Sequence, residues 1–272
     1  VEFIRACKVF CSCNSPSIQA LFDSDPEQEY PLKTIVEPLQ DITDYLRQNV
    51  ASFKTQLTAL DFCRGSNCWV MGLEKFWITA RSVVLATGSH PRALNYHDAA
   101  QAVIPLDQAL DQKVLGNYVN EKDTVAVVGS SHSAVLLLKY LTELTAGRVI
   151  NLYKNPILYP IQMDGWVLHD NTGLMGLTAW WAKEVLEKNP PVKIIRIKNV
   201  NDAAKVWMPI CTKVIYAIGF ERNNLPDIPG ISYDNYDAQT GVIGPRLFGI
   251  GIAFPERVTD PLGNEENAVG LP

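Results

Sequence analysis

Hydrophobic positions in the first third of the chain follow a helical period and then a strand period. Apolar residues recur at steps of three and four after Pro38, which predicts a surface helix that opens at this proline. The expected buried face consists of Leu39, Ile42, Leu46 and Val50. Residues 53–63 and 68–71 flank a short turn and predict a β-hairpin, to which residues 76–80 add a third strand. We therefore expect a small antiparallel meander after the helix.

The pattern changes in the middle of the chain, where continuous aliphatic runs replace alternation. Residues 82–86 form such a run and end sharply at Thr87-Gly88, which predicts a buried strand. A strand at 124–128, a turn from Gly129 to Ser133, a helix at 134–145 and a strand at 149–153 follow. Together they form a βαβ unit of about 30 residues, the building block of a parallel doubly wound sheet. The remaining expected elements are a helix at 177–188 and strands at 192–197 and 213–218.

Two of these strands end in the same way. Residues 83–88 and 214–219 share the pattern Val-x-x-Ala-x-Gly, and they bracket the βαβ unit. This spacing indicates that one nucleotide-binding lobe is inserted into another, with the two matched strands at the crossings.

Composition narrows the functional class. The chain has 47% hydrophobic and 19% charged residues, an ordinary balance for a globular protein. A net charge of -5 without a basic cluster argues against a nucleic-acid partner. No apolar run reaches the roughly 20 residues that span a bilayer, and the first residues carry charges unlike a secretory signal. We expect no membrane partner and a cytoplasmic location, where six cysteines stay reduced.

The turn between the first strand and the helix of the βαβ unit is the strongest local signal for cofactor binding. Such a turn brings backbone N–H groups and a helix N-terminus to the pyrophosphate of a dinucleotide. In the pattern G-x-G-x-x-G/A, Gly129 and Ala134 fit the first and third positions, whereas Ser131 stands at the second. The alternative is a βα turn that binds no nucleotide. The segment of interest comprises Gly129, Ser130, Ser131, His132 and Ser133.

Taken together, these motifs resemble the FAD- and NAD(P)H-dependent pyridine nucleotide oxidoreductases, which include flavin monooxygenases and thioredoxin-reductase-like enzymes. Ala86-Thr87-Gly88 is similar to the A-T-G segment that closes the first FAD section, and Gly219 ends the returning A-x-G strand. The resemblance implies a Rossmann-like, doubly wound α/β lobe for NAD(P)H, inserted into a partial FAD-binding lobe with the meander. The implied divisions are 1–90 and 221–272 for the FAD-binding lobe and 91–220 for the NAD(P)H-binding lobe.

The chain departs from the family pattern at two places. Gly251 stands where the family has a glycine followed by an aspartate that bonds the flavin, but no aspartate follows here. The family's first glycine-rich turn should precede the meander, yet the first glycine is Gly65 and the chain begins at Val1. We therefore expect an incomplete chain that retains FAD weakly, because lost hydrogen bonds to a charged group cost about 1.5 to 3 kcal/mol each.

The residue after the second strand of the βαβ unit bears on cofactor choice. An acidic residue there would bond the ribose 2′-hydroxyl of NADH, whereas Lys154 suits the 2′-phosphate of NADPH. The pattern favours NADPH, with NADH as the alternative. His132 lies inside the turn, where a contact with the cofactor competes with a role as a surface histidine.

Cysteines and histidines supply no further site. Cys63 and Cys68 have the four-residue gap of some redox cysteines, but they flank the predicted hairpin turn, which favours accidental neighbours over a redox pair. No spacing suggests a metal site.

The resemblance implies hydride transfer from NADPH or NADH to FAD and onward transfer to a small-molecule substrate or redox partner. No catalytic residue is identified, as expected where cofactors perform the chemistry. Without a well-placed cysteine pair, a monooxygenase-like or general reductase role is favoured. A disulfide reductase and a non-catalytic redox-sensing module are the alternatives, and homodimer formation is left open.

Overall fold

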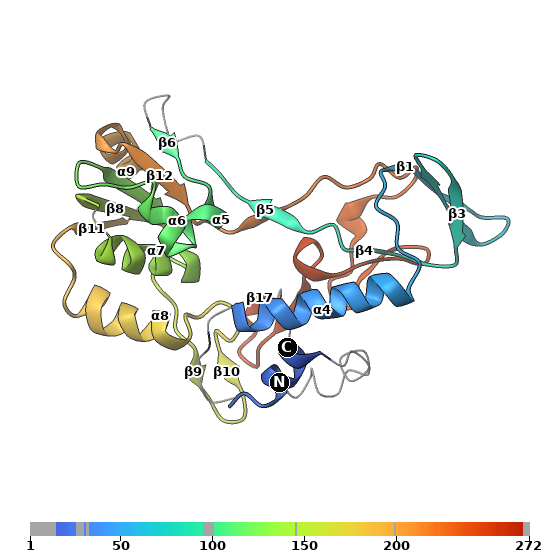
Figure 1. Cartoon of the computed structure of the whole chain (residues 1–272), viewed down its shortest axis with the longest axis horizontal. Helices are drawn as coiled ribbons and strands as arrows, with labels where there is room; N and C mark the ends of the chain where they lie inside the picture. The colour runs from blue at the N-terminus through green and yellow to red at the C-terminus, as the bar shows by residue number, and fades with distance from the viewer. Residues whose placement is uncertain are drawn as a thin grey trace. The chain divides into compact units, whose positions relative to one another are not determined.

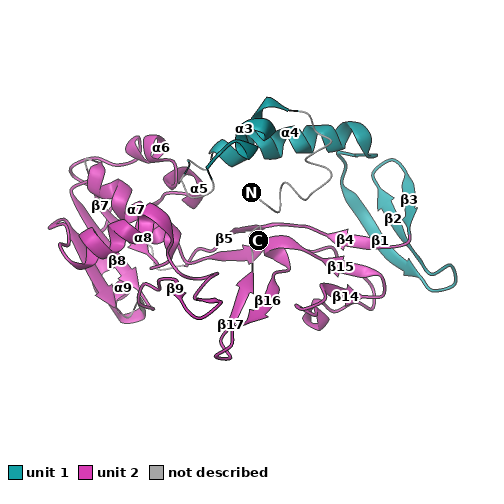
Figure 2. Cartoon of the chain, turned by 90° about the horizontal axis from the view of Figure 1, so that it is seen from below, with its two compact units in different colours: residues 1–80, 271–272 teal, residues 81–270 magenta. Residues whose placement is uncertain are grey.

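The fold was examined in a computed structural model that describes residues 15–25, 30, 33–94, 101–144, 146–198 and 200–268. The chain divides into two compact units, residues 1–80 with 271–272 and residues 81–270 (Figure 2). Each unit is described separately. The predicted division into 1–90, 91–220 and 221–272 stays a prediction.

The first unit contains two helices and the antiparallel meander. The helices are α3 (Pro16–Phe22) and α4 (Lys33–Asn49), and the strands are β1 (Leu57–Cys63), β2 (Cys68–Leu73) and β3 (Trp77–Ala80). Neighbouring strands pair in the order β1-β2-β3, which confirms the predicted meander. Its first strand begins at Leu57, four residues later than expected.

Helix α4 differs from the prediction in its start and in its buried face. Pro38 lies inside the helix rather than at its opening, because the helical segment extends back to Lys33. Of the four positions expected to be buried, only Ile42 is buried. Leu39, Leu46 and Val50 are exposed, and Val50 follows the helix. Ile42 packs with Ile18 and Leu21 of α3.

The second unit is organised around a five-stranded, all-parallel sheet with the order β11-β8-β7-β12-β6 (Figure 1). Its strands are β6 (Ala102–Val103), β7 (Thr124–Val128), β8 (Arg148–Tyr153), β11 (Ile194–Lys198) and β12 (Lys213–Tyr216). Helix α7 (His132–Glu143) connects β7 to β8. The predicted βαβ unit and its parallel sheet are therefore confirmed, with α7 starting two residues earlier than expected.

Both faces of the sheet are covered, as its strand sequences require. Along β7, Val125 and Val127 belong to one buried cluster, and Ala126 and Val128 belong to the other. The first cluster includes residues of α5 (Leu106–Ala109), α6 (Gln112–Gly116), α7 and α8 (Gly176–Trp181). The second includes residues of α9 (Val200–Trp207) and η2 (Met208–Ile210). Burial on both faces explains why these strands are continuously apolar rather than alternating.

The rest of the second unit consists of short strands and turns. In one sheet, β4 (Val83–Leu85) pairs in parallel with β15 (Leu247–Gly249), which pairs with β14 (Val242–Gly244). Three antiparallel pairs complete it: β5 (Ser89–Pro91) with β13 (Phe220–Arg222), β9 (Ile161–Gln162) with β10 (Val167–Leu168), and β16 (Glu256–Thr259) with β17 (Glu265–Ala268). Short helical turns are η3 (Tyr233–Asn235) and η4 (Gly251–Ala253).

Two further expectations need correction. Residues 82–86 do not form a fully buried strand, because β4 is an edge strand of its sheet and Val84 is exposed while Leu85 is buried. The expected helix at 177–188 continues from α8 into a π-helical turn, η1 (Ala182–Glu187).

Within the described residues, no helix is both long enough and apolar enough to cross a membrane.

Candidate functional site

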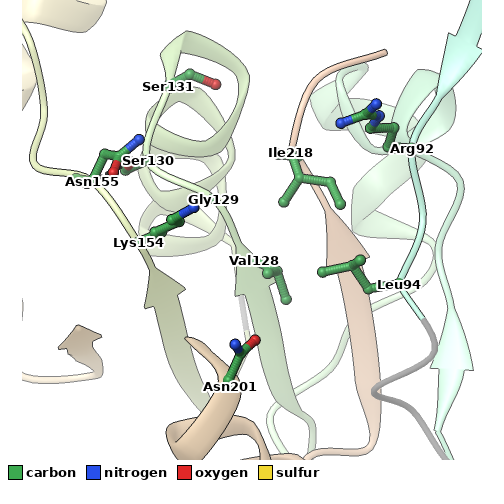
Figure 3. A pocket seen from close by; sticks show the side chains of 11 residues that line it. Arg92, Leu94, Val128, Gly129, Ser130, Ser131, Lys154, Asn155, Asn201 and Ile218 are labelled. Atoms are coloured by element: carbon green, nitrogen blue, oxygen red, sulfur yellow. Dashed lines mark hydrogen bonds between the residues drawn. The ribbon is translucent and has the colours of Figure 1, made fainter. Parts of the chain in front are cut away.

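A cavity of about 450 Å³ lies at the carboxyl ends of the central strands of the parallel sheet (Figure 3). This edge is where open α/β sheets bind their ligands. The cavity is lined by Arg92, Leu94, Val128, Gly129, Ser130, Ser131, Lys154, Asn155, Asn201, Ala217 and Ile218. The residues come from the ends of β7, β8 and β12, from the start of α9 and from the segment after β5.

The turn after β7 allows two backbone segments to approach closely. Gly129 has φ +134°, and a Cβ atom placed on it would lie 2.1 Å from the carbonyl oxygen of Ala217. Only glycine avoids both the strained φ and this clash. The backbone N–H of Gly129 donates to the Leu152 carbonyl at 2.8 Å, so the turn is held to the end of β8. The glycine singled out in the sequence therefore has a steric reason to be there.

A buried asparagine supports the same turn and was not identified from the sequence. Asn151 is fully buried in β8, and its Nδ2 donates to the carbonyls of Gly129 at 2.8 Å and Val127 at 3.0 Å. Its Oδ1 accepts from Arg196 Nε at 3.1 Å. One signal in the sequence could have identified it: a single amide side chain within a largely apolar strand. A buried polar group needs hydrogen-bond partners, so such a residue marks a polar contact in the core. Asn151 therefore fixes the Gly129 carbonyl group in the turn.

Helix α7 presents its N-terminus at this turn. Ser131 is its N-cap residue but makes no side-chain capping hydrogen bond. The first N–H groups of a helix have no partner within the helix, so they are available to an anionic ligand. The Ser130 hydroxyl instead donates to the Asn155 carbonyl at 2.8 Å and fastens the turn to the segment after β8.

Two positively charged side chains line the cavity. Lys154 and Asn155 follow β8 and lie beside the Gly129 turn, whereas Arg92 lies across the cavity near Ile218 (Figure 3). Arg92 Nε is 4.0 Å from a carboxylate oxygen of Glu221, so part of its charge is balanced. Lys154 has no ion pair within the described parts of the chain. Arg92 and Asn201 were missed because they reach the cavity from segments distant in sequence.

Three predicted site residues do not line this cavity. His132 lies at the first position of α7, where its Nε2 is 3.4 Å from the Thr178 hydroxyl and desolvation lowers the pKa of its imidazole. Ser133 follows it in the helix. Gly219 lies beyond the end of β12, and its carbonyl accepts from the Arg92 N–H at 3.0 Å.

The remaining predicted residues lie together at another sheet edge. Because β4 and β15 are parallel neighbours, with Leu85 opposite Gly249, the segments that follow them emerge side by side. Ala86-Thr87-Gly88 follows β4, and Ile250-Gly251 follows β15. The Ile250 N–H donates to the Leu85 carbonyl at 3.0 Å, which joins the two segments. A cavity of about 360 Å³ includes Gly249, Ile250 and Gly251 in its lining.

Thr87 carries an unexplained polar atom in this region. Its Oγ1 is buried without a hydrogen-bond partner in the described structure, although its carbonyl accepts from Asn223 Nδ2 at 2.9 Å. Buried hydroxyl groups without a partner are rare and point to a missing ligand or water. A polar cofactor at the A-T-G segment fits this observation.

Comparison with known proteins identifies the family. The sequence pattern described as pyridine nucleotide-disulphide oxidoreductase matches residues 10–167, which is more than half of the 272-residue chain. The chain belongs to the pyridine nucleotide-disulphide oxidoreductase family. This confirms the resemblance drawn from the Gly129 turn and the A-T-G segment.

The chain is similar in sequence to a monooxygenase and similar in fold to a thioredoxin reductase and a flavin monooxygenase. It is 35% identical to Monooxygenase AgnR1 of Paecilomyces divaricatus over 228 residues, which cover 73% of the chain but only 58% of that protein. Thioredoxin reductase of Lactococcus lactis has a similar fold, with a TM-score of 0.51, 14% identity and coverage of 85% of this chain and 76% of its own. A flavin monooxygenase from Stenotrophomonas maltophilia also has a TM-score of 0.51, with 13% identity and coverage of 84% and 71%.

Proposed function

We propose that the cavity at the Gly129 turn binds NAD(P)H, with its pyrophosphate at the N-terminus of α7. The observation that carries this proposal is the combination of an uncapped helix N-terminus, a glycine that no other residue can replace, and Lys154 and Arg92 in one cavity. A helix N-terminus and cations both favour an anionic ligand. Ser131 is exposed at the position where the usual motif has glycine, and its hydroxyl is available as a donor to a phosphate oxygen.

The flavin is proposed to bind at the other sheet edge, against Ala86-Thr87-Gly88 and Gly251. The unpartnered Thr87 hydroxyl supports this position, as does the hydrogen bond from the Ile250 N–H to the Leu85 carbonyl, which joins the two segments. Strand β5 precedes the strands of the parallel sheet, β13 follows them, and the two strands pair with each other. The chain therefore enters and leaves the parallel-sheet region at neighbouring positions, which supports insertion of an NAD(P)H-binding lobe into a FAD-binding one. No aspartate follows Gly251, so backbone groups would replace that contact.

Bound NAD(P)H would supply a hydride, and bound FAD would accept it. The residues of this chain bind and orient the cofactors: the turn holds a pyrophosphate, Asn151 keeps that turn in place, and Thr87 offers a hydroxyl on the flavin side. For the acceptor we favour a monooxygenase-like reaction on a small molecule, supported by the 35% identity to Monooxygenase AgnR1. A disulfide reductase is the second candidate, supported by the fold of Lactococcus lactis thioredoxin reductase.

A spectroscopic experiment tests the proposed activity. The purified chain is kept in FAD at a concentration well above its measured Kd, and NADPH is added without oxygen, with free FAD and NADPH alone as the blank. Bleaching of the flavin absorption supports hydride transfer. If oxygen then restores the absorption and an added aromatic disulfide is not reduced, the result supports the monooxygenase-like assignment. NADPH binding without any bleaching would instead favour a non-catalytic redox-sensing module.

Replacing Lys154 with glutamate should reverse the preference for NADPH. The change places a carboxylate where the 2′-phosphate is expected, so we expect a roughly 10- to 30-fold rise in the Kd for NADPH, or about 1.4 to 2 kcal/mol. The Kd for NADH should change by less than about threefold, because NADH has a hydroxyl at that position. Isothermal titration with each nucleotide measures both values.

The matched control is Lys122→Glu, which makes the same charge change at an exposed residue before β7, at the opposite edge of the sheet. At physiological salt, screening should leave the Kd values of this variant for NADPH and NADH close to those of the unmodified chain. Equal losses for NADPH and NADH in Lys154→Glu, or equal losses in the two variants, would contradict the assignment of Lys154 to the 2′-phosphate.

Replacing Thr87 with valine should weaken FAD binding without lowering the stability of the chain. Valine keeps the shape of threonine but removes a buried hydroxyl that has no partner, so the free energy of unfolding without FAD should stay the same or rise slightly. If FAD uses that hydroxyl, its Kd should rise about tenfold, by roughly 1.4 kcal/mol. Urea unfolding and flavin titration test the two parts, and an unchanged flavin Kd would remove Thr87 from the site.

A further inference from the structure

Two cysteines face each other at the turn end of the first hairpin. Cys63 is the last residue of β1 and Cys68 the first residue of β2, and the strand register pairs them directly. Directly opposed residues of antiparallel strands have Cβ atoms about 4.5 to 5.5 Å apart. A disulfide needs about 3.5 to 4.5 Å, which a small adjustment next to a turn supplies. Both residues are present as free thiols.

The turn between them adds a polar group that touches both thiols. The Ser66 hydroxyl lies 3.0 Å from Cys68 Sγ, and it also hydrogen-bonds to the Cys63 side chain. Together with backbone groups of Ser66 and Gly65, this contact holds the pKa of the Cys63 thiol below its usual value. The thiolate is the reactive form of cysteine, so the turn activates Cys63.

The two cysteines also differ in access, as an attacking and a resolving thiol do. Cys63 is exposed and therefore reachable by a small molecule, whereas Cys68 is half-buried beside it. In the hairpin turn between them, Asn67 adopts φ +52°. These features distinguish the pair from neighbours that meet by accident, which was the interpretation favoured by the sequence.

We propose that Cys63 and Cys68 form a thiol redox site that is oxidised to an intramolecular disulfide by exchange with a low-molecular-weight disulfide. The Cys63 thiolate attacks one sulfur of the small disulfide, releases one thiolate and becomes a mixed disulfide. The Cys68 thiolate then attacks the Cys63 sulfur and releases the second small thiol. The protein loses two electrons and two protons, and the small disulfide gains both.

This site is additional to the proposed nicotinamide cavity and uses none of its residues. Cys211 provides an internal comparison, because it is buried, its Sγ donates to the Trp207 carbonyl at 3.2 Å, and burial raises the pKa of its thiol to about 11. A buried thiol of this kind is inert toward exchange.

Peptide mapping of the whole chain tests the proposal. The reduced protein is equilibrated with mixtures of glutathione and glutathione disulfide, and free thiols are blocked with an alkylating reagent. Trypsin cuts after Lys54, Arg64 and Lys75, so Cys63 and Cys68 fall on separate peptides, 55–64 and 65–75. We expect these two peptides to be joined at oxidising ratios and separated again by dithiothreitol. Cys211 should remain alkylatable after unfolding.

Two substitutions make the test specific. In Cys68→Ser the mixed disulfide with glutathione should accumulate on Cys63, because its resolving thiol is missing. In Ser66→Ala the alkylation of Cys63 should slow about threefold or more, because less thiolate is present. If the unmodified protein gives only glutathione adducts, or links Cys63 and Cys68 to other cysteines, the proposal is wrong. Equal alkylation rates for Cys63 and Cys211 in the folded protein would also overturn it.

Discussion

Replacing Gly129 with valine should abolish NADPH binding and destabilise the second unit by at least about 4 kcal/mol. The β-branched side chain would have to adopt φ +134°, and its Cβ would lie 2.1 Å from the Ala217 carbonyl oxygen and 2.9 Å from its carbon. Both are backbone atoms at the end of β12, so no rotamer change relieves the clash. The turn must move away from β12, which displaces the N–H groups at the start of α7. Urea unfolding and nucleotide titration measure the two effects.

Gly165→Val is the matched control for backbone strain alone. Gly165 has φ +78°, and a Cβ atom there would meet nothing within 4 Å. This variant should lose about 1 to 3 kcal/mol and keep its nucleotide affinity. A folded Gly129→Val protein that binds NADPH as before would show that the cofactor does not use this turn.

The sequence predicts the βαβ unit well because its signals are local. Strand β7 has the predicted limits, since four consecutive buried residues, 125–128, leave no helical or alternating period. Gly129 was found for the same reason, because a glycine directly after such a strand is a local signal. The start of α7 was predicted two residues late, because Ser130, Ser131 and Ser133 are all suitable N-cap residues.

Features that depend on distant segments could not be predicted in this way. Arg92 and Asn201 join the cavity only after the sheet has brought the segment after β5 and the start of α9 to one edge. Whether Val84 is buried depends on the edge position of β4, which its own sequence does not encode. The hairpin placed Cys63 near Cys68, but the position of the Ser66 hydroxyl depends on side-chain conformation.

Replacing Asn151 with leucine should lower both the stability of the second unit and its affinity for NADPH. Leucine has nearly the same shape, so the change removes hydrogen bonds without a large cavity. The carbonyls of Val127 and Gly129 lose a donor, and Arg196 loses an acceptor, all within or beside the buried sheet. Leaving such groups unpaired should cost about 2 to 4 kcal/mol of unfolding free energy.

The effect on affinity separates Asn151 from an ordinary core residue. Its Nδ2 holds the Gly129 carbonyl, so without it the turn should sample other positions, and the NADPH Kd of the folded variant should rise about tenfold. Thr212→Val is the control, because it removes the 2.7 Å hydrogen bond to Asp123 at the opposite edge of the same sheet. That variant should lose about 1 to 3 kcal/mol of stability and no affinity. If both variants lose stability but neither loses affinity, Asn151 supports the sheet and not the turn.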